Sequence, residues 1–156
     1  LHDAYGLDGE LSTLESERDL NLRLIEAGGQ RWVVKITNRD EPPAIIDCQV
    51  QALTHIGAVD PELPVPAPRK ALDGRPITSI ADALGREHLC HVLSYLPGEI
   101  VGEMRLDRDI LGEAARLVAR LGCSQVHFER RHVRNRAYPK LSGDRSSQKL
   151  IEILFL

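Results

Sequence analysis

The chain has 156 residues, of which 42% are hydrophobic and 28% are charged, and its formal net charge is -3. These values are typical of one ordinary globular domain with a buried core, and they give no reason to expect a nucleic-acid or membrane partner. Three widely spaced cysteines, without an apolar leader or spanning segment, favour a reducing cytoplasm over a secreted disulfide scaffold.

Both ends of the sequence indicate a piece of a longer protein. The chain begins at Leu1 without an initiator methionine and ends on an apolar run over residues 150–156. Termini usually carry polar residues. We therefore expect exposed core-facing surface, which favours self-association.

The first part of the chain is expected to form an antiparallel meander of three strands. Asp8-Gly9 is expected to turn the chain into a first strand that ends near Leu14, and residues 20–26 form the second. The polar residues 15–19 are suited to the hairpin tip between them. A glycine turn then leads into the third strand, residues 31–37.

The third strand carries a single lysine within an apolar alternation. Its two faces carry Trp32, Val34 and Ile36 on one side and Val33, Lys35 and Thr37 on the other. A buried lysine needs an anion, which is either a carboxylate of the protein or the phosphates of a ligand. The alternative is a sheet edge, where a lysine only discourages strand pairing.

A helix is expected from the Pro42-Pro43 pair to about Ile56, with Gly57 as the residue at which the chain leaves it. One arrangement of its apolar stripe places Gln49 on the face toward the sheet, where Lys35 is an available hydrogen-bond partner. In the other, Val50 carries the stripe and Gln49 lies at the edge of the helix. The pattern leaves both open.

The second part of the chain is expected to add two strands. The proline-rich residues 60–68 should run extended across the surface. A hairpin is predicted around Asp73-Gly74 and a second turn at Gly85. The last strand, residues 88–96, is the most apolar and should be central in the sheet.

A second amphipathic helix is expected after Asp107 and should end at Gly122. Its apolar stripe consists of Ile110, Ala114, Leu117, Val118 and Leu121. Five antiparallel strands packed on one helix, followed by a helix and an irregular tail, make the fold class α+β.

Four segments, in this order, resemble the aminoglycoside phosphotransferase and choline kinase-like family of small-molecule kinases. They are residues 16–22, 32–36, 60–66 and 93–98. The likeness is nearest to hydroxylysine kinase-like proteins and to phosphotransferase domains fused to class III aminotransferases, and it covers about residues 5–122. The resemblance implies a protein-kinase-like N-lobe that binds nucleotide and consists of residues 1–98. Residues 99–122 would then form the helix after the hinge, as part of an incomplete second lobe. Residues 123–156 would form a basic, poorly ordered tail.

The resemblance also implies a nucleotide site. The hairpin tip would cover the phosphates, and the lysine would contact them directly. A small apolar residue would pack on the base, and main-chain groups of the hinge would form hydrogen bonds with adenine. The residues expected to bind nucleotide are Ser16, Arg18, Asn21, Val33, Lys35, Gln49, Ser94, Tyr95 and Leu96.

Two departures from the family pattern concern this site. The tip lacks the glycines that let a backbone approach phosphate closely, so its side chains must form any cradle. Gln49 stands where many kinases have a glutamate that pairs with the lysine, which would replace an ion pair by a neutral hydrogen bond.

No catalytic or metal-binding residue is assigned. Phosphoryl transfer in this fold needs an aspartate that orients the acceptor and an acid that holds magnesium. His127 and Glu129, followed by Asn135, do not fit a catalytic loop, because glutamate stands in place of aspartate and the asparagine is out of step. We expect Mg²⁺ only in the complete enzyme.

The functional hypothesis is therefore an ATP-dependent phosphotransferase acting on an alcohol group, present as a truncated N-terminal portion that is inactive alone. The expected acceptor of the complete enzyme is a small hydroxylated amine or amino acid. The alternative is a non-catalytic binding or interaction remnant of the same fold. The basic residues 130–136 are interpreted as a solvated segment rather than a nucleic-acid patch.

Overall fold

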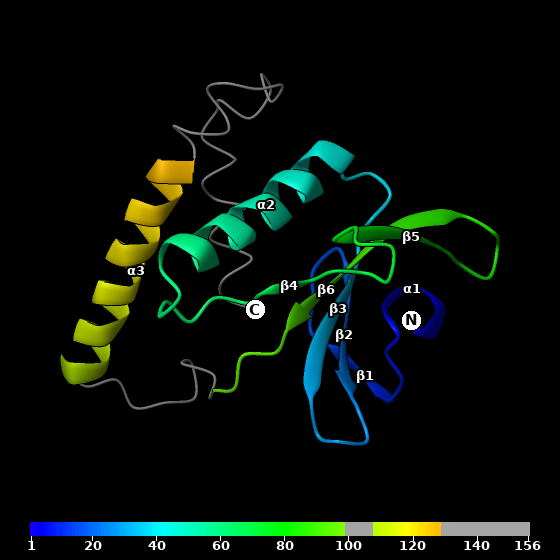
Figure 1. The fold of residues 1–156 in the computed structure, drawn as a ribbon, viewed down its shortest axis with the longest axis horizontal. Helices are drawn as coiled ribbons and strands as arrows, with labels where there is room; N and C mark the ends of the chain where they lie inside the picture. The colour runs from blue at the N-terminus through cyan, green and yellow to red at the C-terminus, as the bar shows by residue number, and fades with distance from the viewer. Residues whose placement is uncertain (99–107, 129–156) are drawn as a thin grey trace. The chain divides into compact units, whose positions relative to one another are not determined.

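The structure is a computed structural model that describes residues 1–98 and 108–128. The described helices and strands (Figure 1) are α1 His2–Tyr5, β1 Glu10–Leu14, β2 Leu20–Ile25, β3 Arg31–Ile36, α2 Pro43–Val59, β4 Pro68–Arg69, β5 Ile77–Ala81, β6 Glu87–Ser94 and α3 Arg108–Phe128. The chain divides into two compact units, one of Leu1–Val50 with Pro66–Tyr95 and one of Gln51–Val65 with Leu96–Leu156. Most of the predicted tail lies outside the described residues.

The first unit is built on an antiparallel sheet in the order β1-β2-β3-β6-β4, with β5 also paired to β6. The predicted meander is confirmed as β1, β2 and β3, and the predicted central strand is β6, which pairs with three others. The α+β class is confirmed, with six strands in place of five. The additional strand, Pro68–Arg69, comes from the proline-rich stretch and lies at an edge of the sheet, where a proline removes no central hydrogen bond.

One face of the sheet carries the apolar core of this unit. In register, Val34 of β3 lies opposite Leu22 on one side and Val92 on the other, and Ile36 lies opposite Cys90. The buried members of this cluster are Tyr5, Leu7, Leu24, Val34, Ala71, Cys90 and Val92. The predicted alternation along β3 is therefore confirmed, and Lys35 lies on the face opposite this core.

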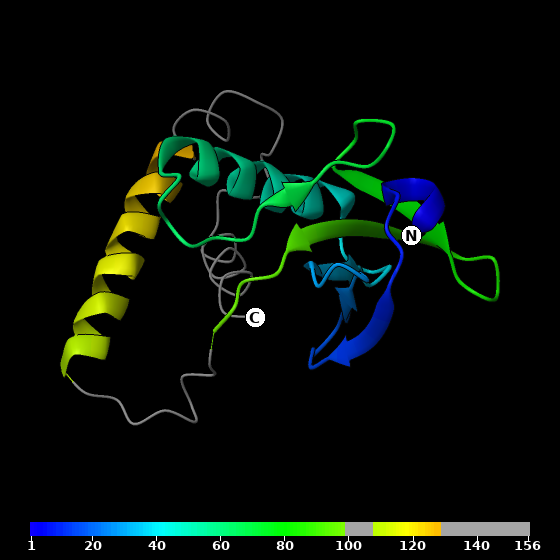
Figure 2. The same cartoon turned by 60° about the horizontal axis from the view of Figure 1, so that its bottom comes forward.

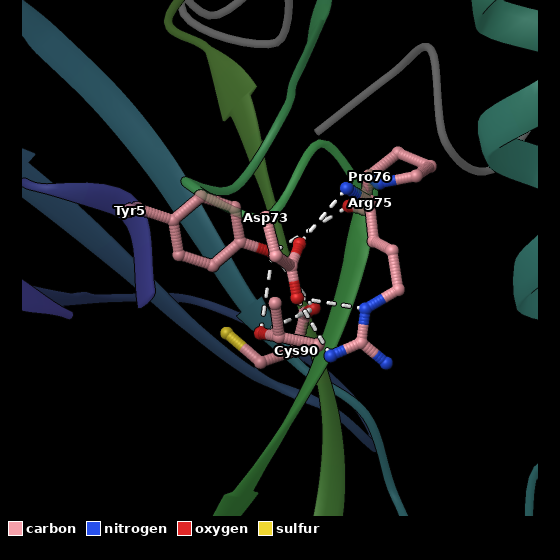
Figure 3. Close-up of polar contacts among 6 residues, drawn as sticks. Tyr5, Asp73, Arg75, Pro76 and Cys90 are labelled. Carbon is pink, nitrogen blue, oxygen red and sulfur yellow. Dashed lines mark hydrogen bonds and ion pairs between the residues drawn. The ribbon is translucent and has the colours of Figure 1, made fainter. Parts of the chain in front are cut away.

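Tyr5 fastens the N-terminal helix to the sheet (Figure 3). Its hydroxyl donates a hydrogen bond to the carbonyl oxygen of Cys90 at 3.1 Å, and the hydroxyl of Thr78 donates to Tyr5 at 3.4 Å. Burial raises the pKa of Tyr5 to about 12, so the phenol stays neutral and keeps its proton to donate. Beside it, Asp73 accepts hydrogen bonds from the main chain and the guanidinium of Arg75, which closes the adjoining turn.

The two predicted helix ends at glycine are wrong. α2 continues through Gly57 to Val59, and α3 continues through Gly122 to Phe128. Neither glycine has the positive φ that a glycine helix stop uses. α2 ends where Asp60 precedes a proline, which disfavours helical backbone at the preceding residue.

The two arrangements left open for α2 are now distinguished. Val50 is 1% exposed and continues the buried stripe from Ile46 to Leu53, whereas Gln49 is half-buried. Val50 therefore carries the apolar stripe, and Gln49 lies at its edge.

The predicted turns are present, but only one joins paired strands. Gly85, with φ 74°, forms the predicted second turn, and this turn closes a hairpin between β5 and β6. Gly74, with φ 84°, also forms a tight turn. The strands on either side of Gly74, β4 and β5, pair with β6 and not with each other, so this turn is no hairpin.

In the second unit, α3 is fixed to the segment that follows α2. Arg120 donates two hydrogen bonds to the carboxylate of Asp60, at 3.0 and 2.6 Å. The rings of His55 and Phe128 lie 5.6 Å apart. Val118 in the predicted apolar stripe of α3 is 55% exposed, and self-association through such surface stays a prediction.

Within the described residues, none of the helices combines the length and apolar character needed to cross a membrane.

Gly9 provides a test of the β1–β2 pairing. A Cβ added there would overlap the carbonyl oxygen of Ile25, which is backbone and cannot move aside cheaply. We expect Gly9→Ala to lower the free energy of unfolding by about 1–3 kcal/mol, as overpacking does. Gly28→Ala is the matched control, because a Cβ at Gly28 meets open space. Equal stability of the two variants in urea unfolding would contradict this register.

Tyr5→Phe tests the fastening of α1. The variant leaves the buried Cys90 carbonyl without this donor, so we expect the free energy of unfolding to fall by about 1 kcal/mol or more. Tyr95→Phe is the control, since the Tyr95 hydroxyl has no hydrogen-bond partner among the described residues, and its change should stay within about 0.5 kcal/mol. Urea unfolding followed by circular dichroism measures both. A Tyr5→Phe protein as stable as wild type would show that the hydroxyl contributes nothing.

Candidate functional site

The candidate site is centred on Lys35, in the middle of β3 on the face opposite the apolar core. The side chain is only 6% exposed. Among the described residues, Lys35 has no carboxylate within ion-pair distance and no hydrogen-bond partner. A buried ammonium group without a counter-charge is unfavourable in a folded protein. This position therefore requires an explanation beyond packing.

The two strands beside β3 place polar residues directly opposite the lysine. Asn21 of β2 is its cross-strand partner on one side and His91 of β6 on the other. Asn21 is 2% exposed and His91 3% exposed. The Oδ1 atom of Asn21 and the Nδ1 atom of His91 are buried and have no hydrogen-bond partner in the described part of the chain. Three neighbouring strands thus bring three buried polar side chains into one row.

Thr37 and Asp19 extend this row beyond the end of β3. Thr37 is 2% exposed, and its hydroxyl oxygen is also buried without a hydrogen-bond partner among the described residues. Asp19 accepts a hydrogen bond from the main-chain amide of Asn38 at 3.0 Å, which ties the hairpin tip to the end of β3.

The electrostatics of the row follow from its burial. Burial lowers the pKa of Lys35, and the negative charge of Asp19 opposes this only in part. Burial and then the positive charge of Lys35 lower the pKa of His91 to about 4, again with Asp19 acting in the opposite direction. At neutral pH the imidazole is therefore uncharged.

The structure brings together some of the predicted residues and leaves others apart. Asn21 and Lys35 form a cross-strand pair, and Val33 lies on the same face of β3. Ser16 and Arg18 are exposed, and the guanidinium of Arg18 lies 4.0 Å from the carboxylate of Glu41. Neither tip residue has a hydrogen bond or ion pair with Lys35 in the described part, so their contribution to a phosphate site remains a prediction.

Gln49 does not make the hydrogen bond to Lys35 that the sequence left as one alternative. No hydrogen bond or ion pair of Gln49 is present within the described residues. The helix is rotated so that Val50 is buried instead. Consequently no helix residue described here replaces the glutamate that many kinases place against this lysine.

The predicted hinge offers fewer free amides than expected. The amide of Ser94 donates to the carbonyl of Ala67 at 2.9 Å, and the amide of Tyr95 donates to the carbonyl of Arg31 at 3.3 Å. The Arg31 guanidinium also lies 4.7 Å from the centre of the Tyr95 ring. The expectation of free main-chain donors is therefore wrong at these two residues. Leu96 is 40% exposed and follows them in extended chain.

Sequence reasoning missed His91 as a site residue. Alternation places Cys90 and His91 on opposite faces of their strand, and the apolar run suggested core and edge positions for both. Cys90 does join the core, but His91 faces Lys35 because β6 pairs with β3 in this register. Only the strand pairing, which connects residues far apart in the chain, brings the two together.

The row is suited to binding an anion. Lys35 supplies a positive charge, and an amide, a hydroxyl and an imidazole around it can each donate a hydrogen bond. Phosphate oxygens would balance the charge of Lys35 and accept a hydrogen bond from the Thr37 hydroxyl or from a protonated His91 Nδ1, whereas Oδ1 of Asn21 is itself an acceptor and needs a donor. Within the described residues, no group of three or more histidine, cysteine or acidic side chains is placed to hold a metal ion.

Two solved structures share the fold. The amicoumacin kinase hAmiN in complex with AMP-PNP, Ca²⁺ and Ami matches with a TM-score of 0.53 and 17% identity, over 64% of this chain and 30% of that one. A microcompartment-associated aminopropanol kinase matches with a TM-score of 0.59 and 20% identity, over 76% of this chain and 36% of that one. The chain thus spans about a third of the length of each. No curated protein matches the chain.

The model of the phosphotransferase enzyme family matches residues 10–149. The match continues beyond Gly122, where the sequence was interpreted as no longer resembling the family, so that boundary is wrong. It covers the sheet, both long helices and most of the segment that follows them. The resemblance to aminoglycoside-type small-molecule kinases is confirmed, and the chain belongs to the phosphotransferase enzyme family.

Proposed function

We propose that this chain contains the nucleotide-binding lobe of an ATP-dependent small-molecule kinase that transfers a phosphoryl group to an alcohol. The observation that carries the proposal is Lys35, a residue that is only 6% exposed and has no carboxylate within ion-pair distance among the described residues. A bound phosphate group would balance the positive charge of such a lysine. The family match and the two kinase structures support the same function.

The residues present fit a nucleotide. Lys35 and Asn21 would hold the phosphates, and Val33 on the same face would contact the base. The amides of Ser94 and Tyr95 are engaged within the protein, so the expected hydrogen bonds of the hinge to adenine, including that of Leu96, stay a prediction. Bound ATP supplies the phosphoryl group, and Mg²⁺ would neutralise its charge in the complete enzyme.

The acceptor is proposed to be a small hydroxylated amine or amino acid. The two solved structures described above, which share this fold, are an aminopropanol kinase and an amicoumacin kinase. The nucleotide site described above does not distinguish among such acceptors.

Lys35→Met tests the nucleotide site. The substitution removes the charge while keeping an unbranched side chain of similar length, so the Kd for ATP should rise about 10- to 100-fold, the size of a lost charge-assisted hydrogen bond. The free energy of unfolding should stay unchanged or rise by about 1 kcal/mol, because an unpaired buried cation is removed. Calorimetric titration with MgATP and urea unfolding measure the two effects.

Lys70→Met is the matched control, since Lys70 is exposed. Both its ATP affinity and its stability should equal those of wild type. If Lys35→Met lost stability while binding ATP normally, the lysine would be structural and the proposal would fail. Wild-type protein that binds no ATP at millimolar concentration would favour the non-catalytic remnant.

A turnover assay tests whether this chain binds ATP without transferring its phosphoryl group. The sequence offers no fitting aspartate and asparagine for a catalytic loop, so we expect MgATP to bind without phosphorylation of amino alcohols or hydroxylated amino acids. Release of ADP and mass spectrometry of the acceptors are the measurements. Robust phosphorylation would retain the kinase function and refute the expected inactivity of the chain alone.

A further inference from the structure

His91 is a buried histidine that the proposed nucleotide site does not yet use. It lies directly across from Lys35, on the strand hydrogen-bonded to β3, and it is 3% exposed. Its Nδ1 atom has no hydrogen-bond partner among the described residues. A buried polar atom without a partner is uncommon unless it serves a ligand, a water molecule or a change of state.

The charged groups that act on His91 come from two directions. β3 presents the ammonium group of Lys35, and the hairpin tip presents the carboxylate of Asp19. On the other side, β5 places Ile77 opposite His91, and this residue carries no charge. After burial, the larger of these two influences on the pKa of His91 is the positive charge of Lys35. A second positive charge on the imidazole would therefore be strongly disfavoured while Lys35 has no counter-ion.

An anion bound at Lys35 reverses this balance. A phosphate group carries up to two negative charges, so the imidazole would then face a net negative environment instead of a lone ammonium. Under these conditions the imidazolium form becomes the favoured one, and the proton comes from the solvent.

We propose that His91 is a positioning residue whose charge responds to phosphate at Lys35: it is neutral in the free protein and takes up one proton when the phosphates of a nucleotide bind. The imidazolium then adds a second positive charge beside that of Lys35 and helps to hold the phosphate by balancing its negative charge. The inference rests on the proposed nucleotide site at Lys35.

The direction of the pH dependence follows from linkage. In the free protein, burial and the charge of Lys35 hold the pKa of His91 at about 4, and bound phosphate moves this pKa upward. Between the two pKa values, binding takes up a proton, so the affinity rises as the pH falls. Below about pH 4 the free protein is already protonated, and the gain ends.

The test is calorimetric titration with MgATP at several pH values between 5 and 7, each in two buffers of different ionisation enthalpy. The difference between buffers counts the protons taken up. His91→Asn removes the group and leaves the protonation of ATP itself unchanged, so the wild-type minus variant difference isolates His91. We expect roughly half a proton of difference near pH 5.5 and an affinity gain from pH 7 to 5 that is about five- to tenfold larger in wild type.

His88→Asn is the matched control. His88 lies on the same strand but on its other face, where it contacts Asp82 at 3.4 Å. This variant should behave as wild type in both measurements. Should His91→Asn fail to fold, the imidazole signal of His91 in wild-type NMR spectra gives the same information, because nucleotide should raise its apparent pKa by about 1.5 to 2 units.

The outcomes distinguish a failure of the His91 proposal from a failure of the nucleotide site at Lys35. If wild type and His91→Asn take up equal numbers of protons, or if nucleotide leaves the His91 signal unmoved, while Lys35→Met still weakens ATP binding, this inference is wrong and the proposed function stands. If ATP binding does not depend on Lys35, the proposed function itself fails, and the role of His91 falls with it.

Discussion

The proposed site depends on a lysine that is buried within the sheet. Lys35 lies on β3, the central strand in the sheet order β1-β2-β3-β6-β4, where it is 6% exposed and has no carboxylate within ion-pair distance among the described residues. Burial favours its neutral form, so the free site is held in a state of raised energy. A ligand that brings negative charge recovers that energy on binding. The sheet must therefore be stable enough to tolerate the unpaired charge.

That stability comes from the other face of the same strands. Because side chains alternate, each strand that contributes to the polar row also contributes to the apolar cluster behind it, as Val34 and Val92 do beside Lys35 and His91. Tyr5 ties this cluster to the N-terminal helix through the Cys90 carbonyl, one residue before His91. Because closely packed side chains leave little room for movement, the core also fixes the positions of the polar side chains on the opposite face of the sheet.

Local patterns were enough to predict most of the fold and part of the site. Alternation placed Lys35 opposite the core face, and the resemblance to small-molecule kinases named Asn21. The partnership with His91 was not predictable, because it depends on the register between strands more than fifty residues apart. The helix end predicted at Gly57 was wrong for a different reason. Glycine weakens a helix, but it ends one only where the backbone adopts a positive φ, and Gly57 has no positive φ.

The position of Gln49 shows why the ligand matters so much to this site. In an ion pair, a carboxylate on the helix would hold the lysine and set its charge before any ligand arrived. Here the helix presents Val50 as its buried residue and leaves Gln49 half-buried, so the described part of the protein supplies no fixed counter-charge. Asp19 opposes the effect of burial on Lys35 only in part, and in our proposal the proton of His91 would follow the occupancy of the site. With a neutral residue at position 49, electrostatic balance in the proposed site would be completed only by a bound anion.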